Sequence, residues 1–163
     1  MVQVYLSLGS NIDRENNLRS GLAELTSIYH ELTLSSLFES EAVGFDGSPF
    51  YNMVVGLKTN QTIDELSKTL RDIEFKFGRE VNAKKFSPRT LDIDILLYGE
   101  LVQTEPVQLP RDEISFNAFV LWPLAEIAPE KIHPVLKQSY LALWQNFDKN
   151  TQKLAIIPFN WQG

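Results

Sequence analysis

Leu91-Asp-Ile-Asp-Ile-Leu-Leu-Tyr98 alternates between polar and apolar side chains over its first half. Successive side chains of a β-strand point to opposite faces of the sheet, so the segment predicts a strand with Asp92 and Asp94 on one face. The other face would be apolar and would carry Leu91, Ile93, Ile95 and Leu97. Aspartate is depleted in strands, and two close carboxylates repel each other unless a cation lies between them. The pair therefore indicates a site for Mg²⁺, which takes oxygen ligands and shares them with phosphates. The alternative is two solvent-facing aspartates on an open sheet.

Three more strands are predicted upstream of this segment. Residues 2–8 alternate, with Val2, Val4, Leu6 and Leu8 on one face. Residues 33–40 and 51–57 are rich in residues that favour strands. A loop containing glycine and proline separates the last two.

Two helices are predicted between these strands. Asn11 or Asp13 can cap the first, because both are preferred at the position that precedes a helix. Its apolar stripe comprises Leu18, Leu22, Leu25 and Tyr29. A capping box of Thr62 and Glu65 opens the second helix, and Gly78 ends it. The apolar stripe of this helix comprises Ile63, Leu66, Leu70, Ile73 and Phe77.

The resulting order is strand, helix, strand, strand, helix, strand. It predicts an α+β fold of the ferredoxin-like type, a largely antiparallel sheet with helices packed on one face. Further helices are expected within 116–127 and 139–146, as a C-terminal extension. Because no repeat or flexible linker interrupts residues 1–163, we expect a single domain.

Composition excludes several classes of protein. The 163 residues include no cysteine, so a disulfide framework or a thiolate metal site is excluded. The net charge of −6 argues against general binding of nucleic acid. The N-terminus lacks the basic start of a signal peptide, and no apolar run approaches the ~18 residues of a membrane helix. We therefore expect a cytoplasmic protein that contacts neither membrane nor nucleic acid.

A local excess of positive charge precedes the aspartate pair. Its basic residues are Arg71, Lys76, Arg79, Lys84, Lys85 and Arg89. Carboxylates that hold a metal, next to arginine and lysine side chains, are what a polyphosphate chain requires. The phosphate-binding glycine loops of other nucleotide-binding proteins are absent. A solvated helix face followed by a polar loop remains the alternative.

Four motifs occur in order along residues 2–130. They are Gly9-Ser-Asn11, Tyr51-Asn52, Pro88-Arg-Thr-Leu-Asp-Ile-Asp-Ile95 and Phe119-Val-Leu-Trp-Pro-Leu-Ala-Glu-Ile-Ala-Pro129. Together they resemble the 6-hydroxymethyl-7,8-dihydropterin pyrophosphokinase family of folate biosynthesis. The resemblance implies a ferredoxin-like fold and transfer of pyrophosphate from ATP to 6-hydroxymethyl-7,8-dihydropterin, with two Mg²⁺ ions. We also expect a monomer that acts on these small molecules.

The resemblance also assigns residues to the site. Asp92 and Asp94 would hold both metal ions, and Arg79 and Arg89 would contact the polyphosphate as further catalytic residues. The rest of the ATP site would comprise Arg71, Glu74, Phe86, Ile95 and Arg111. The pterin site would comprise Ser40, Val43, Phe50, Asn52 and Phe119, with the amide of Asn52 on the edge of the pterin and the two phenylalanines stacked on its faces.

Three positions depart from the family pattern. Arg111 stands where histidine is usual, Asn117 where arginine is usual, and Val81 where a second arginine is expected two residues after Arg79. Arg111 could replace the histidine as a phosphate contact. The departures leave two alternatives open. One is a pterin- or nucleotide-binding relative with weakened catalysis, and the other is a different metal-dependent phosphotransferase or nuclease.

Overall fold

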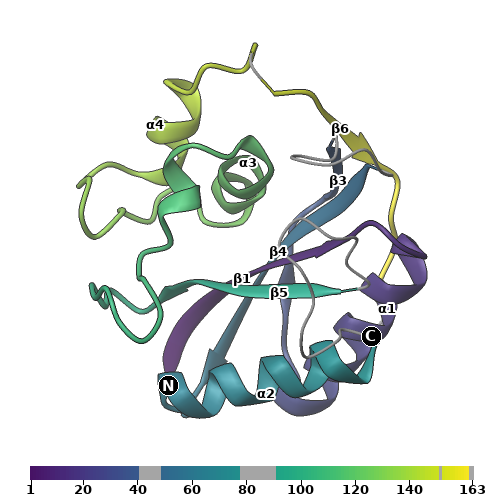
Figure 1. Ribbon diagram of the computed structural model, residues 1–163. Coiled ribbons are helices and arrows are strands. Elements are labelled where there is room, and N and C mark those ends of the chain that lie inside the picture. The colour runs from purple at the N-terminus through teal and green to yellow at the C-terminus, as the bar shows by residue number, and fades with distance from the viewer. Residues whose placement is uncertain (41–48, 78–90, 151, 162–163) are drawn as a thin grey trace.

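The computed structural model describes residues 1–40, 49–77, 91–150 and 152–161. Its centre is an antiparallel sheet in the order β5-β1-β4-β3-β6, with β2 also paired to β4 (Figure 1). The strands are β1 Val2–Ser10, β2 Thr33–Leu34, β3 Leu37–Ser40, β4 Phe50–Thr59, β5 Asp92–Tyr98 and β6 Leu154–Ile157. The four predicted strands thus form the order expected of a ferredoxin-like sheet, and β6 extends it.

The helices α1, Arg14–Tyr29, and α2, Ile63–Lys76, pack on one face of the sheet. The leucines of the predicted α1 stripe are buried, and so are Leu66, Leu70 and Ile73 of α2. The predicted capping box is present: Thr62 Oγ1 accepts from the amide of Glu65 at 3.2 Å, and Glu65 Oε1 accepts from the amide of Thr62 at 2.9 Å. These local signals set where α2 begins.

The prediction of a side-chain cap for α1 is wrong, although one of the two residues proposed for it holds the N-cap position. Asp13 occupies the N-cap position with a left-handed backbone, φ 44°, and its side chain makes no capping hydrogen bond. Its Oδ1 instead accepts from Asn16 Nδ2 at 3.0 Å. Asn11 lies further upstream, buried at the end of β1.

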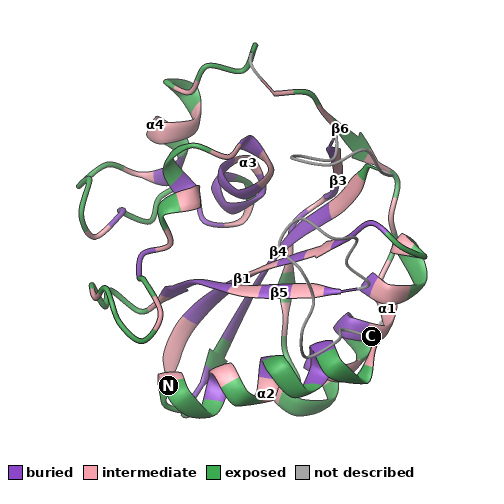
Figure 2. Cartoon of the chain, in the orientation of Figure 1, coloured by how far each residue is buried: buried purple, intermediate pink, exposed green. Residues whose placement is uncertain are grey.

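A second layer of helices covers the opposite face, and it consists of the helices predicted within 116–127 and 139–146, whose position the sequence did not predict. This layer contains α3, Ala118–Ile127, and the short α4, Tyr140–Gln145 (Figure 1). Val120, Leu121 and Leu124 of α3 pack with Tyr5 and Val54 of the sheet. Figure 2 shows α3 as mostly buried, in contrast to the exposed outer sides of α1 and α2. The short 3-10 helix Asp112–Ser115 connects this layer to β5.

A β-bulge changes the direction of the last residues of β5. Ile95 pairs with Leu6 and Leu97 pairs with Tyr5, which leaves Leu96 as an extra residue. Leu97 therefore packs with Tyr5 under α3, on the face opposite Ile93 and Ile95. The prediction for Leu97 was wrong because strict alternation fails at a bulge.

The segment predicted as one strand over 33–40 is two strands, interrupted at Ser35 and Ser36. Ser35 Oγ accepts from the amide of Val54 at 2.9 Å, in place of a backbone carbonyl. Glu126 of α3 accepts from the amide of Ser36 and, at 2.7 Å, from its hydroxyl. Side chains thus satisfy backbone groups where the ladder stops.

Within these described ranges, no helix has both the length and the apolar character needed to cross a lipid bilayer.

Candidate active site

The site is built on a row of residues that runs across the sheet. Asp92 of β5 pairs with Gly9 of β1, Gly9 pairs with Asn52 of β4, and Asn52 pairs with Phe38 of β3. Directly paired residues point to the same face, so this row lies on the face that α3 covers. Asp94 pairs with Ser7 and lies two residues along the same face. The two half-exposed aspartates therefore share one face, ahead of the bulge.

Gly9 leaves space in the middle of this row. A Cβ atom at Gly9 would lie 3.3 Å from Asn52 Oδ1 and 3.8 Å from Phe50 Cδ1. A side chain here would crowd the amide oxygen of Asn52 and fill the space beside Phe50, whereas glycine keeps the strand surface open between these residues and Asp92.

Asn52 is held in one orientation by a neighbouring strand. Its side chain is buried, and Nδ2 donates to Ser40 Oγ of β3 at 2.7 Å. This bond turns the amide oxygen toward Gly9. Of the residues assigned to the pterin, the structure thus brings together Ser40, Phe50 and Asn52. Phe119 is half-buried on α3, over the same face.

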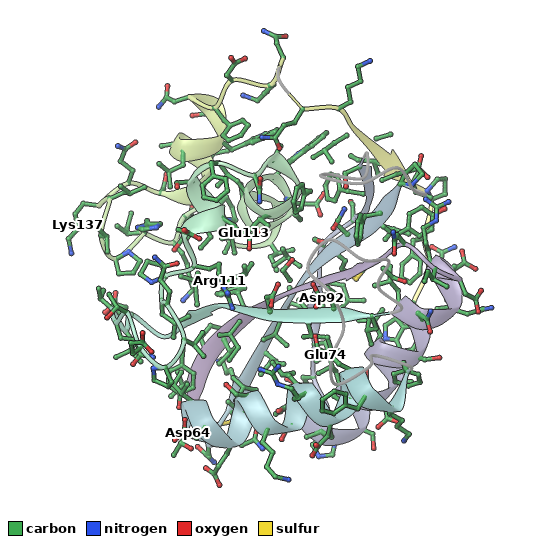
Figure 3. All side chains as sticks on the ribbon, in the orientation of Figure 1. Asp64, Glu74, Asp92, Arg111, Glu113 and Lys137 are labelled. Carbon is green, nitrogen blue, oxygen red and sulfur yellow. The ribbon has the colours of Figure 1, made fainter. Side chains whose placement is uncertain are left out.

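Two side chains bind the outer edge of β5. Glu74 of α2 is 3% exposed, and its Oε2 accepts from the amide of Ile93 at 2.8 Å. Arg111 Nε donates to the carbonyl of Ile95 at 3.2 Å, and its amide donates to the carbonyl of Leu96 at 3.0 Å. Figure 3 shows Glu74 and Asp92 on opposite sides of β5. These bonds satisfy an edge strand that would otherwise offer open backbone groups.

Arg111 also faces the aspartate pair, because its Nη2 lies 3.9 Å from Asp94 Oδ1. A cavity of about 60 Å³ lies between Arg111 and α2, and its lining includes Arg71, Glu74, Asp94 and Ile95. The volume is far below the ~300–1,000 Å³ of a ligand pocket, so this cavity alone could not hold a nucleotide. The side chain of Ile95 packs mainly in the hydrophobic core. The polar group that Ile95 presents at the site is its backbone carbonyl, which accepts from Arg111.

The aspartate pair fits Mg²⁺ by its donor atoms. The described part of the chain contains no group of three or more histidine or acidic side chains arranged to hold a metal. Two carboxylates on one face suit a metal that is shared with a substrate, because Mg²⁺ usually takes one or two carboxylates and fills its shell with phosphate oxygens and water.

Other assigned residues fall outside the described residues: Val43, Arg79, Phe86 and Arg89, together with the departure at Val81. Asn117 precedes α3, and its Nδ2 donates to Glu113 Oε2 at 2.8 Å.

Sequence reasoning missed Arg14, which supports the start of β4. Its Nη1 donates to Glu39 Oε2 at 2.7 Å and to the carbonyl of Pro49 at 3.1 Å. Its guanidinium lies 3.9 Å from the centre of the Tyr51 ring. These contacts fix the backbone on either side of Phe50, and no local sequence signal reports them.

Comparison with known proteins identifies the family. The sequence model of the 7,8-dihydro-6-hydroxymethylpterin-pyrophosphokinase (HPPK) family matches residues 5–129. The chain belongs to the HPPK family. It is therefore an ATP-dependent diphosphotransferase of folate biosynthesis.

Two HPPK relatives are similar over most of their length. The 2-amino-4-hydroxy-6-hydroxymethyldihydropteridine pyrophosphokinase of Aquifex aeolicus is 35% identical over 141 residues, which cover 85% of this chain and 88% of the relative. The protein of the same name from Bacillus subtilis is 39% identical over 131 residues, 77% of this chain and 78% of the relative.

Wild-type Plasmodium falciparum HPPK-DHPS with STZ-DHP shares the fold, with a TM-score of 0.67 at 15% identity. The match covers 88% of this chain but only 41% of that longer chain. The ferredoxin-like prediction for the HPPK domain is confirmed.

Proposed function

We propose that this HPPK-family chain transfers the pyrophosphoryl group of ATP to the hydroxymethyl oxygen of 6-hydroxymethyl-7,8-dihydropterin, as a Mg²⁺-dependent monomer in the cytoplasm. The observation that carries the proposal is the row Asp92, Gly9 and Asn52. It sets an acidic edge, suited to metal and phosphate, next to an oriented amide suited to the rim of a flat heterocycle.

The pterin would occupy the β4–β3 side of the row. Asn52 keeps its oxygen toward Gly9 because its nitrogen is bound to Ser40. The amide can therefore accept a hydrogen bond from the ring without first reorienting, which lowers the entropic cost of binding. Phe50 and Phe119 would supply aromatic contact.

ATP would occupy the β5 side. Asp92 and Asp94 would hold a pair of Mg²⁺ ions, which neutralise charge on the phosphate oxygens. Arg111 is anchored by the carbonyl of Ile95, so its remaining guanidinium nitrogens can face the phosphates from a fixed position. From the family resemblance, Arg79 and Arg89 would contact the same polyphosphate.

The reaction forms a bond from the pterin hydroxymethyl oxygen to the β-phosphorus of ATP. The bond from this phosphorus to the oxygen shared with the α-phosphorus breaks, and AMP leaves with that oxygen. The hydroxyl proton passes to solvent or to a phosphate oxygen. Such transfers depend on alignment and charge stabilisation more than on a strong base, so a fixed pair of binding sites on one rigid sheet supplies what they need.

The test is release of AMP from ATP with 6-hydroxymethyl-7,8-dihydropterin and MgCl₂, measured by chromatography. The pterin is omitted in one control and Mg²⁺ is replaced by EDTA in another. AMP release that requires both supports the proposal. Pterin binding without AMP would indicate a weakened relative, and turnover without pterin would indicate a different phosphotransferase; either result refutes it.

A further inference from the structure

The C-terminal segment 152–157 contacts two separate parts of the proposed pterin site. At its start, the side-chain amide of Gln152 binds the backbone on both sides of Asn117. Nε2 donates to the carbonyl of Phe116 at 2.8 Å, and Oε1 accepts from the amide of Ala118 at 2.8 Å. Figure 1 shows the segment, in yellow, passing from the region of α4 to the outer edge of the sheet.

Gln152 supplies a cap that α3 lacks locally. The first amides of a helix have no partner within the helix, and a side chain just before it usually accepts from one of them. Asn117 holds that position in α3 but makes no capping hydrogen bond, and its side-chain Nδ2 donates to Glu113 Oε2 instead. The amide of Ala118, the first residue of α3, is bound by a glutamine 34 residues away.

The same segment continues as β6, which pairs with β3. Leu154 pairs with Ser40 and Ile156 with Phe38, so β6 covers the open edge of a strand of only four residues. Ser40 is the residue that orients Asn52. The ring of Phe38 lies 4.8 Å from that of Trp122, which joins β3 to α3 above the sheet.

Residues 159 and 160, just after the segment, are fastened to α1. Arg19 Nη1 donates to the carbonyl of Asn160 at 2.9 Å, and its guanidinium lies 4.5 Å from the centre of the Phe159 ring. Residues 152–157 therefore lie between two attachments, one to α3 through Gln152 and one to α1 through residues 159 and 160. This segment lies beyond residues 5–129, which the HPPK family model matches.

We infer that residues 152–157 form a strap that fixes the first turn of α3, with Phe119, relative to the Ser40–Asn52 pair, and that Gln152 is a positioning residue for the pterin. The inference rests on the proposed function for the identity of the ligand. The strap lies at the β6 edge of the sheet and the aspartate pair at the β5 edge. Its loss should therefore affect pterin more than ATP.

The experiment compares Gln152→Met with Gln152→Glu in the full chain. Methionine keeps the length of the side chain and removes both hydrogen bonds, whereas glutamate keeps an acceptor for Ala118 but has no donor for Phe116. Gln145→Met is the matched control, because Gln145 is exposed on α4 and its side chain makes no contact among those described. The measured quantities are kcat, the KM for each substrate and the Kd for pterin alone, from fluorescence.

Loss of the two hydrogen bonds releases the first turn of α3 and should raise the KM and Kd for pterin about fivefold in Gln152→Met, a change in binding as large as one ordinary hydrogen bond to the ligand. Gln152→Glu should fall between this variant and the wild type. The KM for ATP should stay within about twofold in all variants. If Gln152→Met has the same KM for pterin as Gln145→Met, the strap is overturned. An equal rise in the KM values for pterin and for ATP would also overturn it.

Hydrogen exchange separates failure of the strap from failure of the proposed function. In Gln152→Met the amides of β3 and of the first turn of α3 should exchange faster than in the wild type, whether or not the protein turns over pterin. Unchanged exchange in both elements overturns the strap. Absence of pterin-dependent AMP release in the wild type, with faster exchange in the variant, refutes only the ligand assignment.

Discussion

Replacing Glu74 tests whether a buried bond from α2 holds the aspartate-bearing strand in place. Glu74 Oε2 accepts from the amide of Ile93, and Ile93 lies between Asp92 and Asp94. Two neutral substitutions separate the hydrogen bond from the charge. Glu74→Gln keeps an acceptor at nearly the same place, and Glu74→Leu fills a similar volume without one.

The expected difference follows from the burial of the bond. With 3% of Glu74 exposed, water cannot replace the lost acceptor in Glu74→Leu, and an unsatisfied buried amide costs about 1–3 kcal/mol. Both variants lose the desolvation cost of the buried carboxylate, so this term cancels when they are compared with each other. Glu74→Leu should therefore be less stable than Glu74→Gln by about 1–3 kcal/mol.

Activity should follow the same order. A shift of Ile93 displaces the aspartates on either side of it, and small misplacements of catalytic groups cost roughly ten- to a hundredfold in rate. We expect kcat of Glu74→Leu to fall at least about tenfold below that of Glu74→Gln. Urea unfolding gives the stabilities, and AMP release gives the rates. Equal stability and equal kcat in the two variants would refute the role assigned to this bond.

Three further changes probe separate parts of the molecule. Asp94→Ala should abolish Mg²⁺-dependent AMP release with little change in Tm, because it removes a half-exposed acid from a polar surface; Asp64→Ala, an exposed acid on α2, should keep full activity. Thr62→Ala should lower the free energy of unfolding by about 1 kcal/mol through loss of the helix cap, with kcat unchanged, and an unaltered urea midpoint would contradict the capping contact. Burial lowers the pKa of His133, whose Nδ1 accepts from two backbone amides. His133 is therefore protonated at a higher pH in the unfolded chain than in the folded protein. The free energy of unfolding should decrease as the pH falls below about 6.5. His133→Asn should lose less unfolding free energy than the wild type between pH 7.5 and pH 5.5, and equal losses would exclude the histidine.

The sequence alone predicted the order of the strands and two helices up to β5, except for the break between β2 and β3, and the two aspartates on one strand face. These features depend on residues close together in the chain. Side-chain direction in a strand repeats every second residue and in a helix about every 3.6, so covalent geometry fixes which neighbours share a face. The capping box at Thr62 is local for the same reason.

Contacts between distant residues were decided only by the tertiary structure. The bulge that reverses Leu97 depends on how β5 pairs with β1, and the row from Asp92 to Asn52 requires three strands in one register. The cap on Ala118 comes from Gln152, and no spacing rule links positions 34 residues apart. Such pairings are chosen by the packing of the whole sheet and both helical layers, because each backbone group binds whichever partner the folded chain brings within reach.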